Sequence, residues 1–277
     1  MSLDSTRQQT LKLETLIVEQ QEFTLFVTLN RPQARNAMSL KMVQELNQVF
    51  DHVSTTPSIR ALVLRGVDGH FCAGGDIKDM AGARAQAAQT NNAQDAFYTL
   101  NRAFGQMINR ADKIPCVVIT ILEGAVLGGG FGLACVSDVA IVAKDTQFGL
   151  PETGLGVVPA QIAPFVVTRV GLTQARRLAL LGERFDGEEA VRLGIAHYLC
   201  DNKQAIDDTL EKVLGKVRRA APHANRVTKS LLHQVGTIEM DTLLDGAARD
   251  FAAAVKSEEG AEGTLAFVQK RLPTWAD

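Results

Sequence analysis

The sequence predicts an α/β protein with a helical C-terminal region, and three observations support this prediction. Short apolar segments of strand length alternate with longer amphipathic segments as far as about residue 202. Two of the apolar segments run into glycine-rich loops that precede helical patterns. Beyond residue 202 the apolar spacing is helical. A chain of 277 residues is long enough to bury such a layered core, with crossover connections between its strands.

The first elements are expected to be two strands and a helix. Segments 12–19 and 23–29 alternate loosely between apolar and polar residues, which is the period of a half-buried strand. The Asn-Arg-Pro sequence at 30–32 breaks that pattern. Ser39 stands at the N-cap position of a helix whose apolar residues recur at helical spacing: Met42, Val43, Leu46, Val49 and Phe50.

Three apolar runs predict buried strands, and four later patterns predict helices. The strands are expected at 59–64, 115–122 and 138–143, with a helix over 92–110 between the first two. The later helices are expected at 203–219, 221–235, 240–255 and 260–270. Such a helical region serves oligomerisation in some proteins and is an ordinary core layer in others, and the pattern leaves both open. We divide the chain into a polar tail (1–11), an α/β core (12–202) and a C-terminal helical region (203–277).

Charge and composition exclude several classes of protein. The 29 basic and 31 acidic residues give a net charge of −2, so no broad basic field exists for a nucleic-acid backbone or an anionic membrane. No apolar run approaches the roughly 20 residues that span a bilayer. The polar first ten residues lack the apolar segment of a signal peptide. We therefore expect a cytoplasmic protein with neither nucleic-acid nor membrane partners.

Common cofactor, metal and nucleophile motifs are missing. The chain contains no G-x-x-x-x-G-K-[ST], G-x-G-x-x-G, H-E-x-x-H or G-x-S-x-G sequence. No metal site and no bound cofactor are expected. The four cysteines form no C-x-x-C pair and are expected to be reduced core residues: Cys72, Cys116, Cys135 and Cys200.

The two glycine-rich loops, 71–76 and 124–132, are the first candidates for a site. Each follows an apolar strand and precedes a helical pattern. Glycine allows the backbone to approach a ligand closely, and the first N–H groups of a helix have no partner within it. Two such N–H groups from separate loops would form an oxyanion hole. The alternative is that these glycines only permit tight packing of a helix on a strand.

Several segments in order resemble the crotonase superfamily, that is, the enoyl-CoA hydratase/isomerase superfamily. They are NRPQARNAMS (30–39), FCAGGDIKDM (71–80), GAVLGGGFGLACVSD (124–138), FGLPETGLGVVPA (148–160) and AEGTLAFVQKRLPTW (261–275). The resemblance covers nearly the whole chain beyond residue 11. It implies a spiral of ββα units, a C-terminal helical trimerisation region, and assembly as a trimer or a dimer of trimers.

The resemblance also implies the residues of the site. The N–H groups of Gly75 and Gly129 would form the oxyanion hole. Arg35 and Lys78 would suit phosphate groups of coenzyme A (CoA), although both could instead be ordinary surface cations. The residues implied to line the CoA and acyl path are Arg35, Ala37, Ala73, Gly74, Gly75, Asp76, Ile77, Lys78, Gly129 and Gly132.

The glutamates are the point at which this chain departs from the pattern of the family. Hydratases of the family usually carry two, and Gly132 replaces the first, whereas Glu152 matches the second. Hydration needs one group to take a proton from water and one to protonate the α-carbon. Glu152 would have to do both, unless the substrate helps. Its alternative role is that of a carboxylate at a helix start near Pro151.

The predicted reaction is the hydration of a branched, carboxylated enoyl-CoA, which makes the protein a hydro-lyase. Segment 149–180 resembles a bacterial branch that acts on 3-methylglutaconyl-CoA in leucine breakdown or isohexenylglutaconyl-CoA in acyclic terpene breakdown, and a slight preference goes to the isohexenyl substrate. A glycine likewise replaces the first glutamate in that branch. Two alternatives stay open: an enoyl-CoA double-bond isomerase and a non-catalytic acyl-CoA-binding protein. No cofactor is implied beyond the CoA of the substrate.

A physical reason for Gly132 can be offered as a hypothesis. The substrate has its own carboxylate close to the carbon that receives water, and a second enzyme carboxylate there would repel it. Gly132→Glu should then slow glutaconyl thioesters more than crotonyl-CoA. The apolar run 162–167 is expected to serve core packing or to line the acyl pocket.

Overall fold

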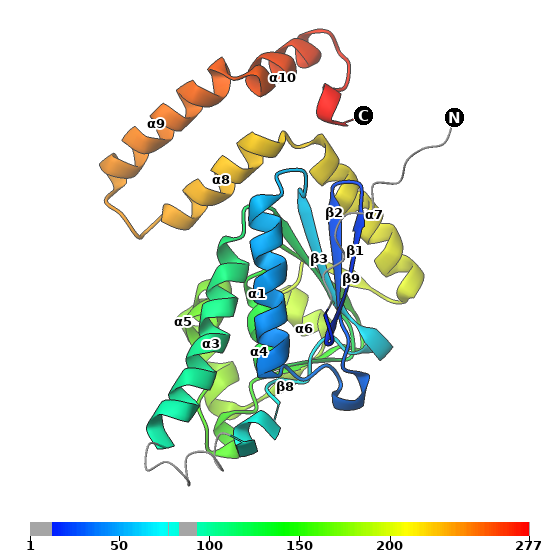
Figure 1. Ribbon diagram of the computed structural model, residues 1–277, viewed down its shortest axis with the longest axis vertical. Coiled ribbons are helices and arrows are strands. Elements are labelled where there is room, and N and C mark those ends of the chain that lie inside the picture. The colour runs from blue at the N-terminus through cyan, green and yellow to red at the C-terminus, as the bar shows by residue number, and fades with distance from the viewer. Residues whose placement is uncertain (1–12, 77, 83–92, 277) are drawn as a thin grey trace.

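The computed structural model describes residues 13–76, 78–82 and 93–276, so the predicted tail (1–11) and Ile77 lie outside the described residues (Figure 1). A six-stranded sheet with the order β1-β2-β3-β4-β6-β9 forms the centre. Only the β1–β2 pair is antiparallel. The strands are β1 (Leu16–Gln21), β2 (Thr24–Leu29), β3 (Ala61–Gly66), β4 (Val117–Leu122), β6 (Val139–Ala143) and β9 (Tyr198–Cys200).

Helices cover both faces of this sheet. Helices α1 (Leu40–Thr55) and α3 (Ala93–Lys113) lie on one face, and α7 (Lys203–Arg219) lies on the other (Figure 1). The remaining helices are α4 (Gly129–Cys135), α5 (Ala163–Leu181), α6 (Gly187–Arg192), α8 (Pro222–Gln234), α9 (Met240–Lys256) and α10 (Glu258–Val268), and residues 78–82 are also helical.

The alternation of side chains along β3 explains the two covered faces. Leu62 and Leu64 belong to the cluster that contains the apolar residues of α1 and α3. Ala61 and Val63 belong to a second cluster, which includes five apolar residues of α7. Because successive strand residues point to opposite faces, a fully apolar strand needs a helix layer on each side.

A smaller, three-stranded sheet lies beside the central one and carries the glycine loops. It pairs β5 (Ala125–Leu127) with β7 (Gln147–Gly149) in parallel, and β7 with β8 (Arg184–Phe185) antiparallel. Two isolated parallel bridges, Met38–Gly75 and Cys72–Val126, extend the same ladder. These short strands were not predicted, because segments of two or three residues show no readable period.

The predicted C-terminal region divides into two parts. Helix α7 packs on the central sheet as a core layer, whereas α8, α9 and α10 form an arm that extends from the core (Figure 1). Lys229 of α8 ties the arm to the core by donating to Asp138 (2.6 Å) and to the carbonyl of Cys116 (3.0 Å). Helix α10 starts two residues earlier than predicted, because the Ser257 hydroxyl caps the N–H of Gly260.

Several predictions about single elements are confirmed. Ser39 caps α1 by accepting from the N–H of Met42. The four cysteines are buried and unpaired. The first strand starts at Leu16, later than predicted, because the N–H groups of Glu14 and Thr15 bond the carboxylate of Glu45, which is buried in α1.

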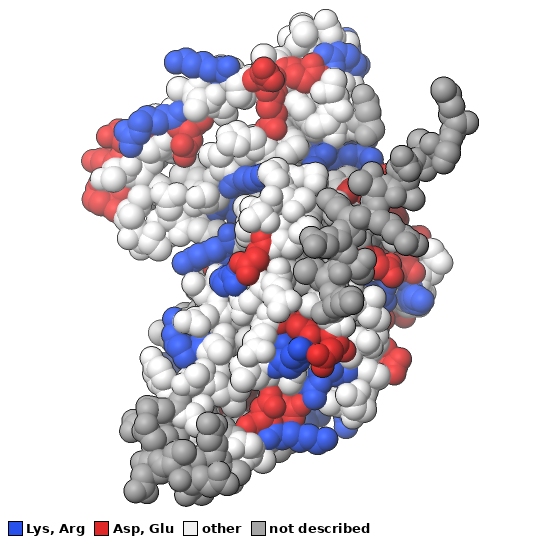
Figure 2. Space-filling model, in the orientation of Figure 1, with Lys and Arg blue, Asp and Glu red and all other residues white. Residues whose placement is uncertain are grey.

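Two surface properties agree with the composition. Positive and negative side chains are interspersed over the visible face (Figure 2). Among the described residues, no helix combines the length and the apolar character that crossing a membrane requires.

Candidate active site

Backbone hydrogen bonds hold the loop Phe71–Asp76 between two other segments. On one side, the N–H of Ala73 donates to the carbonyl of Arg35 (3.0 Å), and the N–H of Met38 donates to the carbonyl of Gly74 (2.8 Å). On the other side, Cys72 forms two hydrogen bonds with β5. Its N–H donates to the carbonyl of Ala125 (2.8 Å), and its carbonyl accepts from the N–H of Leu127 (2.9 Å). The first and second resembling segments are therefore neighbours in space, and the loop cannot shift independently of either.

Asp76 fixes the far end of that loop instead of lying open. Its carboxylate is buried, accepts from Arg31 (2.5 Å) and accepts from the N–H of Lys78 (2.8 Å). Burial alone would raise the pKa of Asp76, but the hydrogen bonds from Arg31 and Lys78 together with their positive charges lower it below its ordinary value. Arg31 also donates to the carbonyl of Ala37, so its guanidinium joins the two segments.

The second glycine loop makes a sharp turn at Gly128 before α4 begins. Gly128 has φ 47° and ψ −115°, a conformation that L side chains rarely adopt, and its N–H donates to the carbonyl of Gly149 (3.1 Å). Gly129 is the first residue of α4, where N–H groups have no partner within the helix. Among the hydrogen bonds of the described residues, neither the Gly129 N–H nor the Gly75 N–H is a donor.

Glu152 reaches this turn because β7 pairs with β5. The register places Leu127 opposite Gly149, so the chain after β7 passes Gly128. A Cβ atom on Gly128 would lie 2.8 Å from Oε1 of Glu152 and 3.6 Å from Cα of Gly74. Glu152 thus lies against Gly128, which precedes Gly129, and Gly128 in turn lies near Gly74, which precedes Gly75. The two glycine loops and the segment after β7 therefore meet at one place.

The carboxyl group of Glu152 is in an environment that disfavours its charge. Its Oε2 atom is buried and has no hydrogen-bond partner among the described residues. Burial raises the pKa of Glu152, and the hydrogen bond from its own backbone N–H only partly opposes that rise. A carboxylate whose pKa is raised is a stronger base than an exposed one, and it can return the proton that it has taken. Beside two N–H groups that have no partner among the described residues, it has the properties of an acid–base group at an oxyanion hole.

Gly132 lies one helical turn after Gly129 in α4, and both glycines face apolar side chains. A Cβ atom on Gly132 would lie 2.4 Å from Cγ2 of Ile162 and 3.3 Å from Cδ1 of Ile108. A Cβ atom on Gly129 would lie 2.8 Å from Cζ of Phe104. The structure therefore fills the position of the missing glutamate with hydrocarbon. Within the run 162–167, Ile162 and Val166 belong to the core, as one of the two interpretations expected.

The remaining predicted residues lie around the loop Phe71–Asp76. Arg35 and Lys78 are exposed, and Ala37 and Ala73 are partly exposed. The segments that carry these two alanines lie side by side, because the N–H of Ala73 donates to the carbonyl of Arg35. Ile77 lies outside the described residues. The two cations therefore flank the loop at the surface, where a polyanionic group could be held without being buried.

Sequence reasoning missed two contributors to this site, Arg31 and Phe104, and it named Ile162 only as part of the run 162–167, without its contact with Gly132. Arg31 was treated only as part of a pattern break. The spacing of Phe104 and Ile108, four residues apart in one helix, was the available signal that both face α4. No local signal identifies Ile162 as the neighbour of Gly132, because the two are brought together by tertiary packing.

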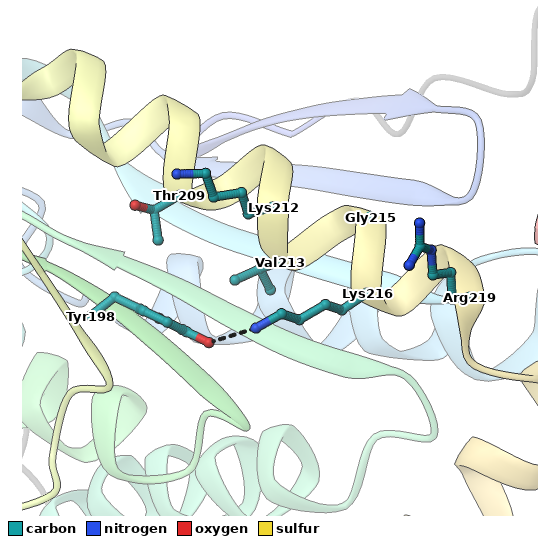
Figure 3. A pocket seen from close by; sticks show the side chains of 7 residues that line it. All are labelled: Tyr198, Thr209, Lys212, Val213, Gly215, Lys216 and Arg219. Atoms are coloured by element: carbon teal, nitrogen blue, oxygen red, sulfur yellow. Dashed lines mark hydrogen bonds between the residues drawn. The ribbon is translucent and has the colours of Figure 1, made fainter.

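A separate cavity of about 560 Å³ lies away from these residues, between β9 and α7 (Figure 3). Lys216 donates to the hydroxyl of Tyr198 there (3.3 Å). Its cations Lys212, Lys216 and Arg219 are exposed and sit in the C-terminal half of α7, where they complement the helix dipole. Among the described residues, no group of three or more His, Cys, Asp or Glu side chains has the arrangement of a metal site.

Comparisons with known proteins agree with this geometry. A family model described as enoyl-CoA hydratase/isomerase matches residues 19–277. The structure of AtuE from Pseudomonas aeruginosa is 61% identical, has a TM-score of 0.92 and is matched over 95% of this chain and 100% of that one. An enoyl-CoA hydratase/isomerase structure from Marinobacter aquaeolei is 60% identical, with a TM-score of 0.92 over 95% and 99% of the two chains. The human mitochondrial methylglutaconyl-CoA hydratase is 28% identical over 89% of this chain and 72% of its own length.

Proposed function

The chain belongs to the enoyl-CoA hydratase/isomerase family, whose hydratases are hydro-lyases, and on that premise we propose that it hydrates a branched, carboxylated enoyl-CoA. In this proposal Glu152 is the acid–base group, and the N–H groups of Gly75 and Gly129 hold the thioester oxygen. The observation that carries it is the contact between the Glu152 carboxyl, whose pKa is raised, and the turn at Gly128.

The proposed reaction has two steps. The Glu152 carboxylate takes a proton from water while the water oxygen bonds to the β-carbon, and the double-bond electrons move to the thioester oxygen as an enolate. The two N–H groups stabilise the negative charge on that oxygen. Glu152 then gives the same proton to the α-carbon, the enolate collapses, and the sum is the addition of one water molecule.

For the substrate we propose isohexenylglutaconyl-CoA or 3-methylglutaconyl-CoA. The support is a relative named methylglutaconyl-CoA hydratase together with the lack of space for a second glutamate at position 132. Both candidates carry a carboxylate of their own, and a second enzyme carboxylate beside it would cost electrostatic energy. The isohexenyl substrate belongs to acyclic terpene breakdown and the methyl substrate to leucine breakdown.

For CoA we propose that the exposed cations Arg35 and Lys78 bind its phosphates and that residues 73–76, with Ala37, flank its pantetheine. Exposed cations at the rim suit a phosphate, since the charges stay partly solvated and need no burial. The reaction moves one proton and forms one C–O bond, so no cofactor beyond the CoA of the substrate takes part in the proposal.

We also propose that the arm α8–α10 forms the interface of a trimer or a dimer of trimers. Several of its large apolar side chains are more than half exposed, which is unusual for a chain that stays monomeric. They are Leu232, Val235, Met240, Leu244, Phe251, Val255, Phe267, Val268 and Leu272.

The test is the hydration rate of the purified protein on isohexenylglutaconyl-CoA, 3-methylglutaconyl-CoA and crotonyl-CoA. We expect one glutaconyl thioester to react at least tenfold faster than crotonyl-CoA. Glu152→Gln should lower kcat by about 10²–10⁴-fold, the usual contribution of a general acid–base group. Glu123→Gln is the matched control, because Glu123 pairs with Arg65 (3.3 Å), and it should keep its activity. Equal losses in the two variants would refute the assignment of Glu152.

A single carboxylate also suits a double-bond isomerase, in which one group moves a proton between two carbons. Gly132 is the specific observation in favour of this second candidate. Reaction in H₂¹⁸O separates the two, because only hydration introduces the heavy oxygen into the product. A 3-enoyl-CoA that is converted without label, with no hydration of any thioester, would favour the isomerase.

A further inference from the structure

Position 132 has no space for any side chain, and one residue is responsible. The Cβ atom of a side chain there would lie 2.4 Å from Cγ2 and 3.1 Å from Cβ of Ile162. Contacts under 3.0 Å between a Cβ and another carbon essentially never occur in proteins. Ile108 is a weaker obstacle, because its contact at 3.3 Å is made by Cδ1, the flexible end of its side chain.

Neither backbone can retreat easily from this contact. The N–H of Gly132 bonds the carbonyl of Gly128 (3.0 Å), and its own carbonyl accepts from Val136 (3.2 Å). The N–H of Ile162 bonds Pro159 (3.2 Å), and its carbonyl accepts from Val166 (3.0 Å). Ile162 is only 3% exposed, so its side chain has no route into solvent.

We infer that Ile162, through its branch methyl Cγ2, is a specificity-determining residue that keeps a second glutamate out of position 132. The inference rests on the proposed function and deepens it. Gly132 and Ile162 act as a pair: the glycine makes room for the isoleucine, and the isoleucine excludes any acidic side chain. The wall beside Gly129 is therefore hydrocarbon, which suits a substrate with a branched acyl group that brings its own negative charge.

The packing part of the inference is tested by thermal unfolding, which needs no substrate. Gly132→Ala should lower the melting temperature by about 5 °C, the effect of overpacking one methyl group in a core. In an Ile162→Leu background the side chain branches at Cγ and no longer at Cβ. There, Gly132→Ala should lower the melting temperature by less than half as much. Ile162→Val keeps Cγ2 and is the matched control, in which the full loss should persist.

Two outcomes of the unfolding experiment would overturn the inference. One is a Gly132→Ala variant as stable as the wild type. The other is an equal relief of the loss by Val and by Leu at position 162. Each double variant is compared with its own Ile162 single variant, so that the cost of changing the isoleucine itself does not enter the comparison.

The specificity part is tested with the double variant Gly132→Glu/Ile162→Ala, compared with Ile162→Ala alone. The added carboxylate should raise the ratio of kcat/KM for crotonyl-CoA to kcat/KM for 3-methylglutaconyl-CoA at least tenfold. A ratio that stays constant in a folded double variant would overturn the inference. Failure of the wild type to hydrate any thioester, with the unfolding results as expected, would count against the proposed function instead.

Discussion

Glu152 combines two properties that conflict in a stable protein. One of its carboxyl oxygens is buried with no partner among the described residues, and burial raises its pKa. A buried carboxyl whose pKa is raised in this way costs stability when it ionises, yet the same environment prepares it to transfer protons. The site thus carries a local instability that the rest of the fold must offset.

This conflict predicts that Glu152→Gln stabilises the protein in a pH-dependent way. Because the folded pKa lies above the ordinary value of 4.5, the wild type loses stability as the pH rises from 4.5 through the raised pKa. The neutral amide does not. The melting temperature of the variant should equal that of the wild type below pH 4.5 and exceed it by roughly 2 °C at pH 8. A variant that is less stable than the wild type at pH 8 would contradict the burial argument.

At the scale of elements, the loop Phe71–Asp76 depends on the ion pair between Arg31 and Asp76. Arg31, in the segment 30–39, donates hydrogen bonds both to Asp76 and to the carbonyl of Ala37. Backbone hydrogen bonds join the loop to the same segment. The position of the Gly75 N–H is thus determined from both sides. A small shift of an oxyanion donor lowers the reaction rate strongly, because the stabilisation that the donor provides depends on its alignment with the developing charge.

Asp76→Asn should therefore act on turnover more than on binding. We expect kcat to fall about 10–100-fold with a much smaller change in KM, and Arg31→Lys to lose less, since it keeps the charge. Asp76→Asn should also lower the free energy of unfolding by about 2 kcal/mol, which is less than the loss that follows when a fully buried ion pair is broken. Steady-state kinetics and thermal unfolding measure the two effects. A rise in KM with unchanged kcat would mean that Asp76 contacts the substrate directly.

The same pair has a defined pH dependence. Since the pKa of Asp76 is lowered from 3.8, its contribution to stability is complete above pH 3.8 and is lost as the pH falls through the lowered value. The difference in melting temperature between the wild type and Asp76→Asn should then be constant at neutral pH and shrink only in strong acid. A difference that disappears already at pH 6 would assign the effect to another group.

At the scale of the whole molecule, Arg60 joins the central sheet to the C-terminal part of the chain. Its guanidinium donates to three carbonyls at the end of α7, those of Val217 (2.8 Å), Arg218 (2.6 Å) and Ala220 (2.8 Å). It also donates to the carbonyl of Trp275 (2.8 Å), close to the C-terminus. One side chain thus caps a core helix and anchors the end of the arm.

Arg60→Ala should lower the free energy of unfolding by about 3 kcal/mol, because four partly buried carbonyls lose a charged donor. Arg60→Lys should recover part of this, since one ammonium group cannot reach all four carbonyls. Denaturant unfolding measures both losses. A neutral Arg60→Ala variant would show that water replaces the guanidinium at no cost.

The arm should control assembly through its exposed apolar surface. Phe251 and Phe267 are 72% and 85% exposed, so glutamate at both positions should prevent association while leaving the core intact. Light scattering after size-exclusion chromatography should give an oligomer for the wild type and a smaller species for the double variant. Ile17→Glu, on β1 and outside the arm, is the matched control. Equal masses for all three proteins would exclude the arm as the interface.

The sequence predicted most of the long elements within a few residues, and the errors have a common physical origin. Strand 12–19 starts later than expected because buried Glu45 takes the N–H groups of Glu14 and Thr15. The small sheet was missed because its strands are too short to show a period. Helix α7 was grouped with the arm, since its apolar spacing is that of any amphipathic helix. In each case the deciding partner is far away in the sequence.

The sequence by itself determined the alternation of strands and helices, the two glycine loops, and Glu152 as the remaining carboxylate of the family pattern. These follow from local spacing and from residue identity. Only the tertiary structure decided that Arg31 holds Asp76, 45 positions away, and that Ile162 fills the space at Gly132. Such contacts arise when separate elements pack at interior density, and no local pattern encodes which two surfaces will meet.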